Sequence, residues 1–167
     1  MDANQLKFII EELSFSSVLP PGVLDHLSVE STVQKVSAGT VVFREGSHHD
    51  NLYLVRSGKL GLDMNVPGRG AVRILTLGPG EMVGWSSLLD QGRMTACAVA
   101  LEDVEVVVAP SHKLREICES NHEFGFHLMR QMAGALSKRL VATRLQLLDL
   151  FADTPASVPV NTPEGAE

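Results

Sequence analysis

The alternation of polar and apolar positions divides this chain into a short helical start, a β-rich middle and a helical end. Between residues 4 and 13, leucines and isoleucines recur at helical spacing, and Pro20-Pro21 opens a second short helix. From about Ser31 onward, apolar residues fall in short runs that are separated by glycines. Seven or eight such runs, spaced by about ten residues, predict the strands of a sandwich, jelly roll or barrel.

Two of these runs lead to different expectations. Residues 60–66 alternate between apolar and polar side chains, which is typical of a strand with one buried face. Residues 71–77 are almost continuously apolar, so we expect this second strand to be largely buried. Pro110 stops the last strand, and Ser111 is expected to cap the helix that follows.

A long helix is expected from Asn121, which caps it, to about Ala152. Along it, residues recur at alternating spacings of four and three, which is the pattern of a coiled-coil seam with one polar position. The seam consists of Met129, Ala133, Leu136, Leu140, Thr143, Leu147 and Leu150. More apolar residues lie off the seam than one small β-roll can cover, so we expect a homodimer through residues 122–152. The alternative is a helix that is buried only in its own domain.

The chain is thus expected to have four parts. Residues 1–28 form an N-terminal helical segment, residues 29–110 the β-rich domain, and residues 111–152 the C-terminal helices. Residues 153–167 contain three prolines and almost no core-forming residues, which predicts a disordered tail.

Composition narrows the classes of function. The formal net charge of -6 argues against a chain that mainly binds the phosphate backbone of nucleic acids. No run approaches the roughly 18 apolar residues of a membrane span, and the start lacks the layout of a signal peptide. Cys97 and Cys118 are not spaced from other possible ligands in a way that is typical of a metal site. We therefore expect both cysteines to behave as small buried apolar residues in a reducing cytoplasm.

Residues 80–96 differ from the runs around them. A strand end meets Gly84, a helix start carries Ser86 and Ser87, and Arg93 stands among small residues. The N-terminus of a helix favours an anion, and an arginine can add a charge-assisted fork. We interpret this stretch as a cradle for an anion, most simply a phosphate. The alternative is a serine-capped turn with Arg93 in a surface salt bridge.

The glycine framework before this cradle resembles that of the cyclic nucleotide-binding domain family. The matching residues are Gly39, Phe43, Glu45, Gly46, Asp50, Leu52, Tyr53 and Gly58. Residues 77–84 resemble the start of the family's phosphate-binding cassette, and the long helix is similar to the dimerisation helix of the Crp/Fnr regulators. The resemblance covers roughly residues 10–152.

The resemblance implies a mainly β fold with helices (α+β), namely a β-roll of jelly-roll type with N-terminal helices and a long C-terminal dimerisation helix. It also implies that backbone N–H groups and Arg93 hold a cyclic phosphate. Thr143 matches a position at which some family members touch the base. The candidate ligand-binding residues are Gly84, Trp85, Ser86, Ser87, Arg93, Met94, Thr95 and Thr143.

Two positions depart from the family's pattern. Trp85 stands where a glutamate usually accepts a hydrogen bond from the ribose 2′-hydroxyl, and Met94 stands where a small or hydroxyl residue usually contacts phosphate. Tryptophan accepts no hydrogen bond, so a buried ribose hydroxyl would be left unpaired at a cost of about 1–3 kcal/mol. Three ligand hypotheses therefore stay open: cAMP or cGMP, an altered ligand with an apolar group, and an empty pocket filled by Trp85.

We therefore expect a stand-alone regulatory module that binds a small anion and passes a shift of its long helix to an unknown partner protein. Only a short tail follows that helix, so no direct DNA binding and no membrane contact are expected from this chain. The alternatives are a ligand-free dimerisation domain and the effector-domain fragment of a Crp/Fnr transcription regulator.

A metalloenzyme of the cupin type is a remote alternative, suggested by His48-His49. Adjacent residues of a strand point to opposite faces, and no further histidine and glutamate follow at a suitable spacing. No nucleophile–base pair or carboxylate dyad is indicated either. We expect no catalytic residue and no metal ligand.

Overall fold

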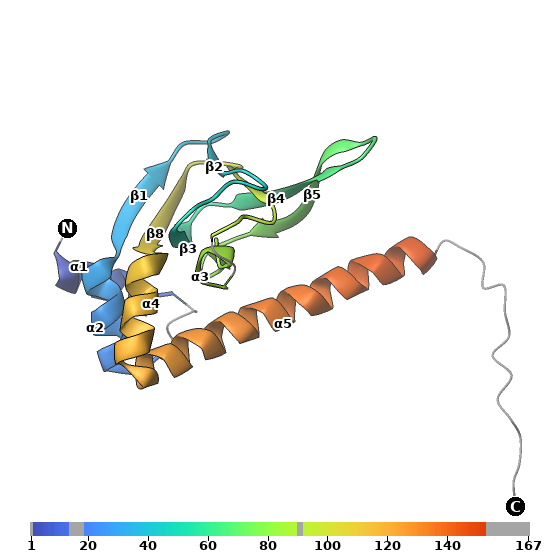
Figure 1. The fold of residues 1–167 in the computed structure, drawn as a ribbon. Helices are drawn as coiled ribbons and strands as arrows, with labels where there is room; N and C mark the ends of the chain where they lie inside the picture. The colour runs from blue at the N-terminus through green and yellow to red at the C-terminus, as the bar shows by residue number, and fades with distance from the viewer. Residues whose placement is uncertain (1, 14–18, 90–91, 153–167) are drawn as a thin grey trace, which may run out of the picture. The chain divides into compact units, whose positions relative to one another are not determined.

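The structure is a computed structural model that describes residues 2–13, 19–89 and 92–152 (Figure 1). The chain divides into two compact units, residues 1–133 and 134–167, and the division falls inside the last helix. The predicted tail lies outside the described residues. No helix in the described ranges combines the length and the apolar character that crossing a membrane requires.

Two helices open the first unit. Helix α1 (Ala3–Glu11) begins with a capping box, in which Asp2 accepts a hydrogen bond from the backbone N–H of Gln5 at 2.8 Å. Helix α2 (Pro21–Glu30) begins with a proline, whose missing N–H costs nothing at that position. The two helices pack together through their buried apolar stripes. The stripes consist of Leu6, Ile9 and Ile10 in α1 and Val23, Leu24 and Leu27 in α2.

Eight strands follow in the described residues, arranged as two antiparallel sheets of four strands each. The strands are β1 (Thr32–Val36), β2 (Val41–Phe43), β3 (Asn51–Ser57), β4 (Leu60–Val66), β5 (Gly70–Leu77), β6 (Met82–Val83), β7 (Cys97–Ala100) and β8 (Val104–Pro110). Their order is β1-β8-β3-β6 in one sheet and β2-β7-β4-β5 in the other. The predicted β-roll flanked by helices is confirmed.

The core of the roll lies between the two sheets. Each sheet supplies side chains that are completely or almost completely buried. Val55 and Val106 come from one sheet, and Leu60, Leu77 and Ala98 come from the other. Burial of this apolar surface is the main stabilising contribution in the first unit.

Strand β5 contradicts the expectation of a largely buried strand. Val72 and Ile74 are 37% and 38% exposed, and Leu77 alone in this strand is completely buried. In the described residues β5 pairs only with β4, so it forms the edge of its sheet. The pairing also shifts register beside Asp63, which forms an ion pair with Arg73. The apolar run therefore lies in an exposed edge strand. Periodicity alone does not distinguish such an edge strand from a buried one.

Three helices complete the described chain: α3 (Ser86–Leu89), α4 (Ser111–Ser120) and α5 (His122–Ala152). The predicted cap of α5 is confirmed, because the side-chain oxygen of Asn121 accepts a hydrogen bond from the N–H of Phe124 at 3.0 Å. The predicted cap of α4 is wrong. Ser111 is the first residue of that helix, and its buried hydroxyl pairs with the hydroxyl of Ser87 in α3.

Helix α5 belongs to both units. In the first unit, Phe124, Leu128 and Met132 are almost completely buried and attach the start of the helix to the domain. In the second unit, exposed apolar side chains recur along the helix, with exposed fractions of 52–63%. These residues are Leu140, Val141, Leu145 and Leu148.

Gly58 offers a direct test of how the turn between β3 and β4 packs against Asp103 and Val104. Its φ is 79°, and a Cβ there would lie 2.5 Å from the carbonyl oxygen of Asp103. Gly39 has the same φ, but no atom lies within 4 Å of its Cβ position. We expect Gly58→Ala to lower the free energy of unfolding by about 3 kcal/mol or more, and Gly39→Ala by about 1 kcal/mol. Urea unfolding measures both, and equal losses would contradict a steric role for Gly58.

Candidate phosphate-binding cassette

The predicted cassette, residues 84–95, begins with a tight turn. Gly84 follows β6 with a φ of 84°, and a Cβ there would lie 2.6 Å from the carbonyl oxygen of Asn51. Only glycine therefore lets this turn approach β3 so closely. The carbonyl of Gly84 accepts hydrogen bonds from the N–H and the hydroxyl of Ser87, at 3.0 and 2.6 Å. The short helix α3 thus begins where the sequence places a helix start.

The two serines of the turn lie inside the protein. Ser86 is 4% exposed and Ser87 is completely buried. The hydroxyl of Ser87 contacts both the carbonyl of Gly84 and the hydroxyl of Ser111. In this structure Ser87 therefore joins α3 to α4, and its hydroxyl is already paired with protein atoms.

Arg93 lies on the surface at the other end of the cassette. Its Nε donates to the carbonyl of Gly46 at 3.3 Å, and its backbone forms a bridge with His48. Among the described residues no carboxylate pairs with its guanidinium, so the alternative of a surface salt bridge finds no partner in that part of the chain.

The remaining candidate residues divide between core, surface and helix. Met94 is 2% exposed and packs in the core of the roll, whereas Thr95 is exposed and Trp85 is half-buried. Thr143 belongs to the second unit, where its hydroxyl donates to the carbonyl of Arg139 at 2.9 Å. Residues 84–89 and 92–95 therefore share the first unit, and Thr143 does not.

The loop of residues 44–50 holds the end of the cassette through its backbone. Gly46 donates its N–H to the carbonyl of Met94 at 2.7 Å, and Met94 donates its own N–H to the carbonyl of Ser47 at 2.9 Å. One step further, His49 donates to the carbonyl of Gly92 at 2.8 Å. Sequence reasoning did not assign this role to the loop, because backbone pairing between distant segments leaves no local pattern.

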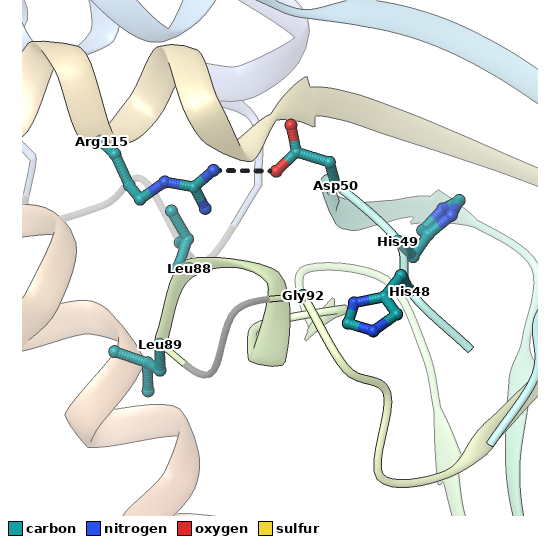
Figure 2. A pocket seen from close by; sticks show the side chains of 7 residues that line it. All are labelled: His48, His49, Asp50, Leu88, Leu89, Gly92 and Arg115. Atoms are coloured by element: carbon teal, nitrogen blue, oxygen red, sulfur yellow. Dashed lines mark hydrogen bonds and ion pairs between the residues drawn. The ribbon is translucent and has the colours of Figure 1, made fainter. Parts of the chain in front are cut away.

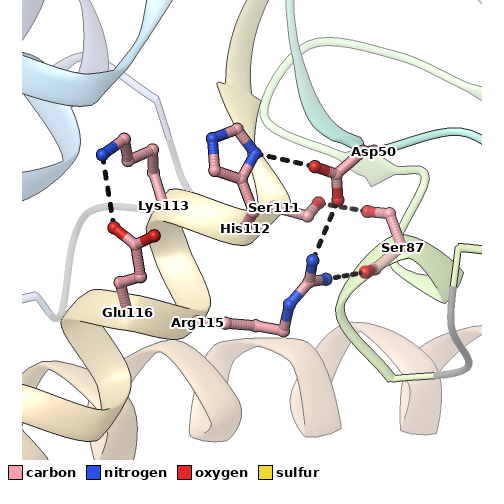
Figure 3. A network of polar contacts seen from close by, with 7 residues as sticks. All are labelled: Asp50, Ser87, Ser111, His112, Lys113, Arg115 and Glu116. Carbon is pink, nitrogen blue, oxygen red and sulfur yellow. Dashed lines mark hydrogen bonds and ion pairs between the residues drawn. The ribbon is translucent and has the colours of Figure 1, made fainter.

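Asp50 links that loop to both neighbouring helices (Figure 3). Its carboxylate pairs with Nδ1 of His112 at 2.7 Å and with Nη2 of Arg115 at 3.1 Å. Arg115 also donates through Nη1 to the carbonyl of Ser87 in α3. We call Asp50, Ser87, Ser111, His112 and Arg115 the Asp50 clasp. Through it, one carboxylate connects the start of β3 with α3 and α4.

The clasp shifts the pKa of the Asp50 carboxyl. Burial by itself raises the pKa of Asp50, but the hydrogen bonds and charges of His112 and Arg115 outweigh burial. The pKa of Asp50 therefore lies below its usual value of 3.8.

An aromatic stack lies beside the clasp. The ring of His49 lies almost parallel to that of Tyr53, with centroids 5.5 Å apart, and its Nε2 contacts the hydroxyl of Tyr53. Phe43 packs 5.7 Å from His49 and 6.2 Å from Tyr53. Burial lowers the pKa of His49 below its usual 6.5, although the charge of Asp50 opposes the shift. Burial also raises the pKa of Tyr53.

An open cleft of about 630 Å³ lies between the loop, α3 and α4 (Figure 2). It is lined by His48, His49, Asp50, Leu88, Leu89, Gly92 and Arg115. None of the eight candidate ligand-binding residues predicted from the sequence lines this cleft. In the described parts of the chain, no cluster of three or more histidine, cysteine or acidic residues is placed to hold a metal ion.

Sequence comparison now identifies the family. The sequence profile of the cyclic nucleotide-binding domain matches residues 33–121. The chain belongs to the cyclic nucleotide-binding domain family. A CRP-like cAMP-activated global transcriptional regulator of Mycobacterium tuberculosis is 34% identical over 122 residues, which are 72% of this chain and 52% of the relative. The chain therefore spans about half the length of that curated relative.

Solved structures agree with this assignment. The catabolite activator protein of Thermus thermophilus has a TM-score of 0.65 and 30% identity, over 83% of this chain and 62% of that one. A cyclic nucleotide-binding domain from Methylobacillus flagellatus has a TM-score of 0.76 over 89% of this chain and 83% of that one. Its identity is 17%, so this second likeness supports the fold alone.

The lowered pKa of His49 predicts a pH dependence of stability. The folded state binds fewer protons than the unfolded state once the pH falls below 6.5, so stability is lost as the pH falls toward the folded-state pKa of His49. His49→Phe keeps an aromatic ring beside Tyr53 and removes the titrating group. Between about pH 7.5 and about pH 5.5, we expect this variant to lose less stability than the wild type in urea unfolding.

The exposed His122 supplies the control for this experiment. His122→Phe should keep the pH dependence of the wild type, because it leaves the stack intact. A His49→Phe variant with the same pH dependence as the wild type would show that the stack does not titrate in this range.

Proposed function

We propose that this protein is a regulatory module that binds a small anionic ligand at residues 84–95, with cAMP or cGMP as the first candidates. The observation that carries this proposal is the position of Arg93, which lies on the surface without a carboxylate partner in the described residues. The family assignment adds to it. The relative from Mycobacterium tuberculosis is named as cAMP-activated, which supports cAMP as the first ligand to test.

The two departures from the family's pattern now have a physical meaning. Met94 packs in the core of the roll, so its thioether contributes to stability and offers no donor to a phosphate. Backbone N–H groups and Arg93 would then have to hold the phosphate without a neighbouring hydroxyl. The indole of half-buried Trp85 offers a flat apolar surface. We therefore expect weaker binding of ribose-containing ligands, or a ligand with an apolar group in place of the ribose.

The clasp supplies a route from the cassette to the long helix. Arg115 of α4 donates to the carbonyl of Ser87 in α3, so a ligand that moves α3 also pulls on α4. Only Asn121 separates α4 from α5. A ligand can shift this arrangement only if it binds one helix position more tightly than the other.

We further propose that the protein is a homodimer through α5 and that a shift of α5 is read by a partner protein. Support comes from the exposed apolar residues Leu140, Val141, Leu145 and Leu148. A ligand-free dimerisation domain remains the alternative if no nucleotide binds. The sequence similarity to a transcriptional regulator favours a second alternative. In that alternative the chain is the effector domain of a longer regulator of that type.

Trp85 permits a direct test of ligand binding, because it is the single tryptophan of the chain. Titration with cAMP and with cGMP should change its fluorescence to saturation. Arg93→Ala removes the guanidinium and should weaken binding by about tenfold or more, since hydrogen bonds to a charged group contribute about 1.5–3 kcal/mol. Arg69 is an exposed arginine in the turn between β4 and β5, and Arg69→Ala should bind both nucleotides like the wild type.

Two results would contradict this proposal. A fluorescence change that is identical in Arg93→Ala and the wild type would place the ligand elsewhere. No saturable change with either nucleotide, confirmed by calorimetry, would leave an altered ligand or the ligand-free dimerisation domain.

Light scattering tests the dimer. The wild-type protein should show twice the mass of the 18.0 kDa chain. Leu140→Asp places a charge on the exposed seam and should shift the protein toward the single-chain mass, because an unpaired charge in an apolar interface is costly. Val29→Asp changes a residue of α2 that is 68% exposed and should leave the mass unchanged. A wild-type mass of one chain at high concentration would overturn the dimer.

A further inference from the structure

The cleft between the loop of residues 44–50, α3 and α4 combines cationic and apolar walls. Arg115 lies beside Asp50, Leu88 and Leu89 lie on the same side of the cleft as Arg115, and His48 and His49 lie on the other side, as Figure 2 shows. Its volume of about 630 Å³ lies within the range of small-molecule sites.

Arg115 still has donors to offer. A guanidinium carries five N–H donors, and the contacts of Arg115 with Ser87 and Asp50 use two of them. Its side chain is 43% exposed, so the remaining donors can reach a ligand without leaving the clasp. A planar carboxylate matches this fork geometry.

Asp50 sets the charge of the ligand. Its carboxylate forms an ion pair with Arg115 at 3.1 Å and already neutralises much of the charge of that guanidinium. A dianion such as a phosphate monoester would meet stronger repulsion from Asp50 than a monoanion would. The site therefore favours a carboxylate over a phosphate.

Leu88 and Leu89 favour an apolar group in the ligand. Leu89 is 54% exposed and Leu88 is half-buried, and both line the cleft at the end of α3. Apolar groups that shield Leu89 from water would gain roughly 25 cal/mol for each Å² that they bury. A ligand with a carboxylate at one end and an aromatic or branched apolar tail at the other can contact both Arg115 and the two leucines.

We propose that this cleft is a second small-molecule site, which binds a small carboxylic acid with an aromatic or branched apolar tail. The carboxylate pairs with Arg115, and the tail lies on Leu88 and Leu89. The site shares the segment of Leu88, Leu89 and Gly92 with the cassette but uses none of the eight candidate ligand-binding residues, and it does not depend on nucleotide binding. Gly92 lines the cleft and directly precedes Arg93, so an acid bound here lies next to the cassette.

Hydrocinnamate is a suitable probe, because it joins one carboxylate to a phenyl ring through a short flexible chain. In a titration of the ¹⁵N-labelled full chain, we expect saturable amide shifts concentrated at residues 48–50, 88, 89, 92 and 115. Hydrocinnamyl alcohol keeps the tail without the charge, and acetate keeps the charge without the tail. Both should bind at least about tenfold more weakly than hydrocinnamate.

Variants separate the contribution of Arg115 from that of the two leucines. Leu89→Ser removes the exposed apolar side chain without touching the clasp, and it should weaken hydrocinnamate binding about tenfold. Arg115→Gln should weaken it at least as much. Val29→Ser changes an equally exposed apolar residue in α2 and should bind like the wild type. Arg93→Ala should also leave hydrocinnamate binding unchanged, which distinguishes this site from the cassette.

Several results would overturn the proposal. One is equal affinity for hydrocinnamate and hydrocinnamyl alcohol. A second is unchanged affinity of Leu89→Ser for hydrocinnamate. A third is a set of amide shifts that centre on residues 84–86 and disappear in Arg93→Ala. Tighter binding of phenyl phosphate than of hydrocinnamate would overturn the assignment of a carboxylate. Loss of cAMP binding in Arg93→Ala with hydrocinnamate binding retained would support both sites separately.

Discussion

The arrangement of this domain depends on the carboxylate of Asp50, which joins segments that are far apart in the sequence. The side chains of Asp50 and Arg115 are 49% and 43% exposed, and an ion pair in such surroundings contributes little by itself. The buried hydroxyls of Ser87 and Ser111 make the contact specific, because removing the Ser87 hydroxyl would take away the hydrogen-bond partner of the buried Ser111 hydroxyl. The charged groups then orient α4, and the buried pair fixes its distance from α3.

Backbone hydrogen bonds place the cassette more firmly than its side chains do. The loop of residues 44–50 pairs with Gly92 and Met94, on both sides of Arg93, so the arginine is held in position before any ligand arrives. Gly84 fixes the other end, because a Cβ there would strike β3. A site positioned in this way can exchange individual side chains, such as Trp85 and Met94, and keep its shape.

Sequence reasoning succeeded where the determining contacts are local. The strands, the cap at Asn121 and the glycine turns follow from spacing and from backbone conformation. It failed where a distant segment decides: β5 is an exposed edge because of its place in the sheet, and Ser111 pairs with Ser87, which lies 24 positions earlier. The role of Met94 also depends on which side of the chain faces the core. Periodicity cannot report any of these relations.

Helix α5 is connected to α4 through a single residue. Its buried residues Phe124, Leu128 and Met132 belong to the first unit, and exposed apolar residues occur in both parts of the helix, at Phe126 and Met129 and again from Leu140 to Leu148. Asn121 alone separates it from α4 and is bonded to both helices, through Ile117 on one side and Phe124 on the other. A displacement of α4 must therefore either break these bonds or move the start of α5. Because the bonds are short and local, movement of the helix is the less costly response.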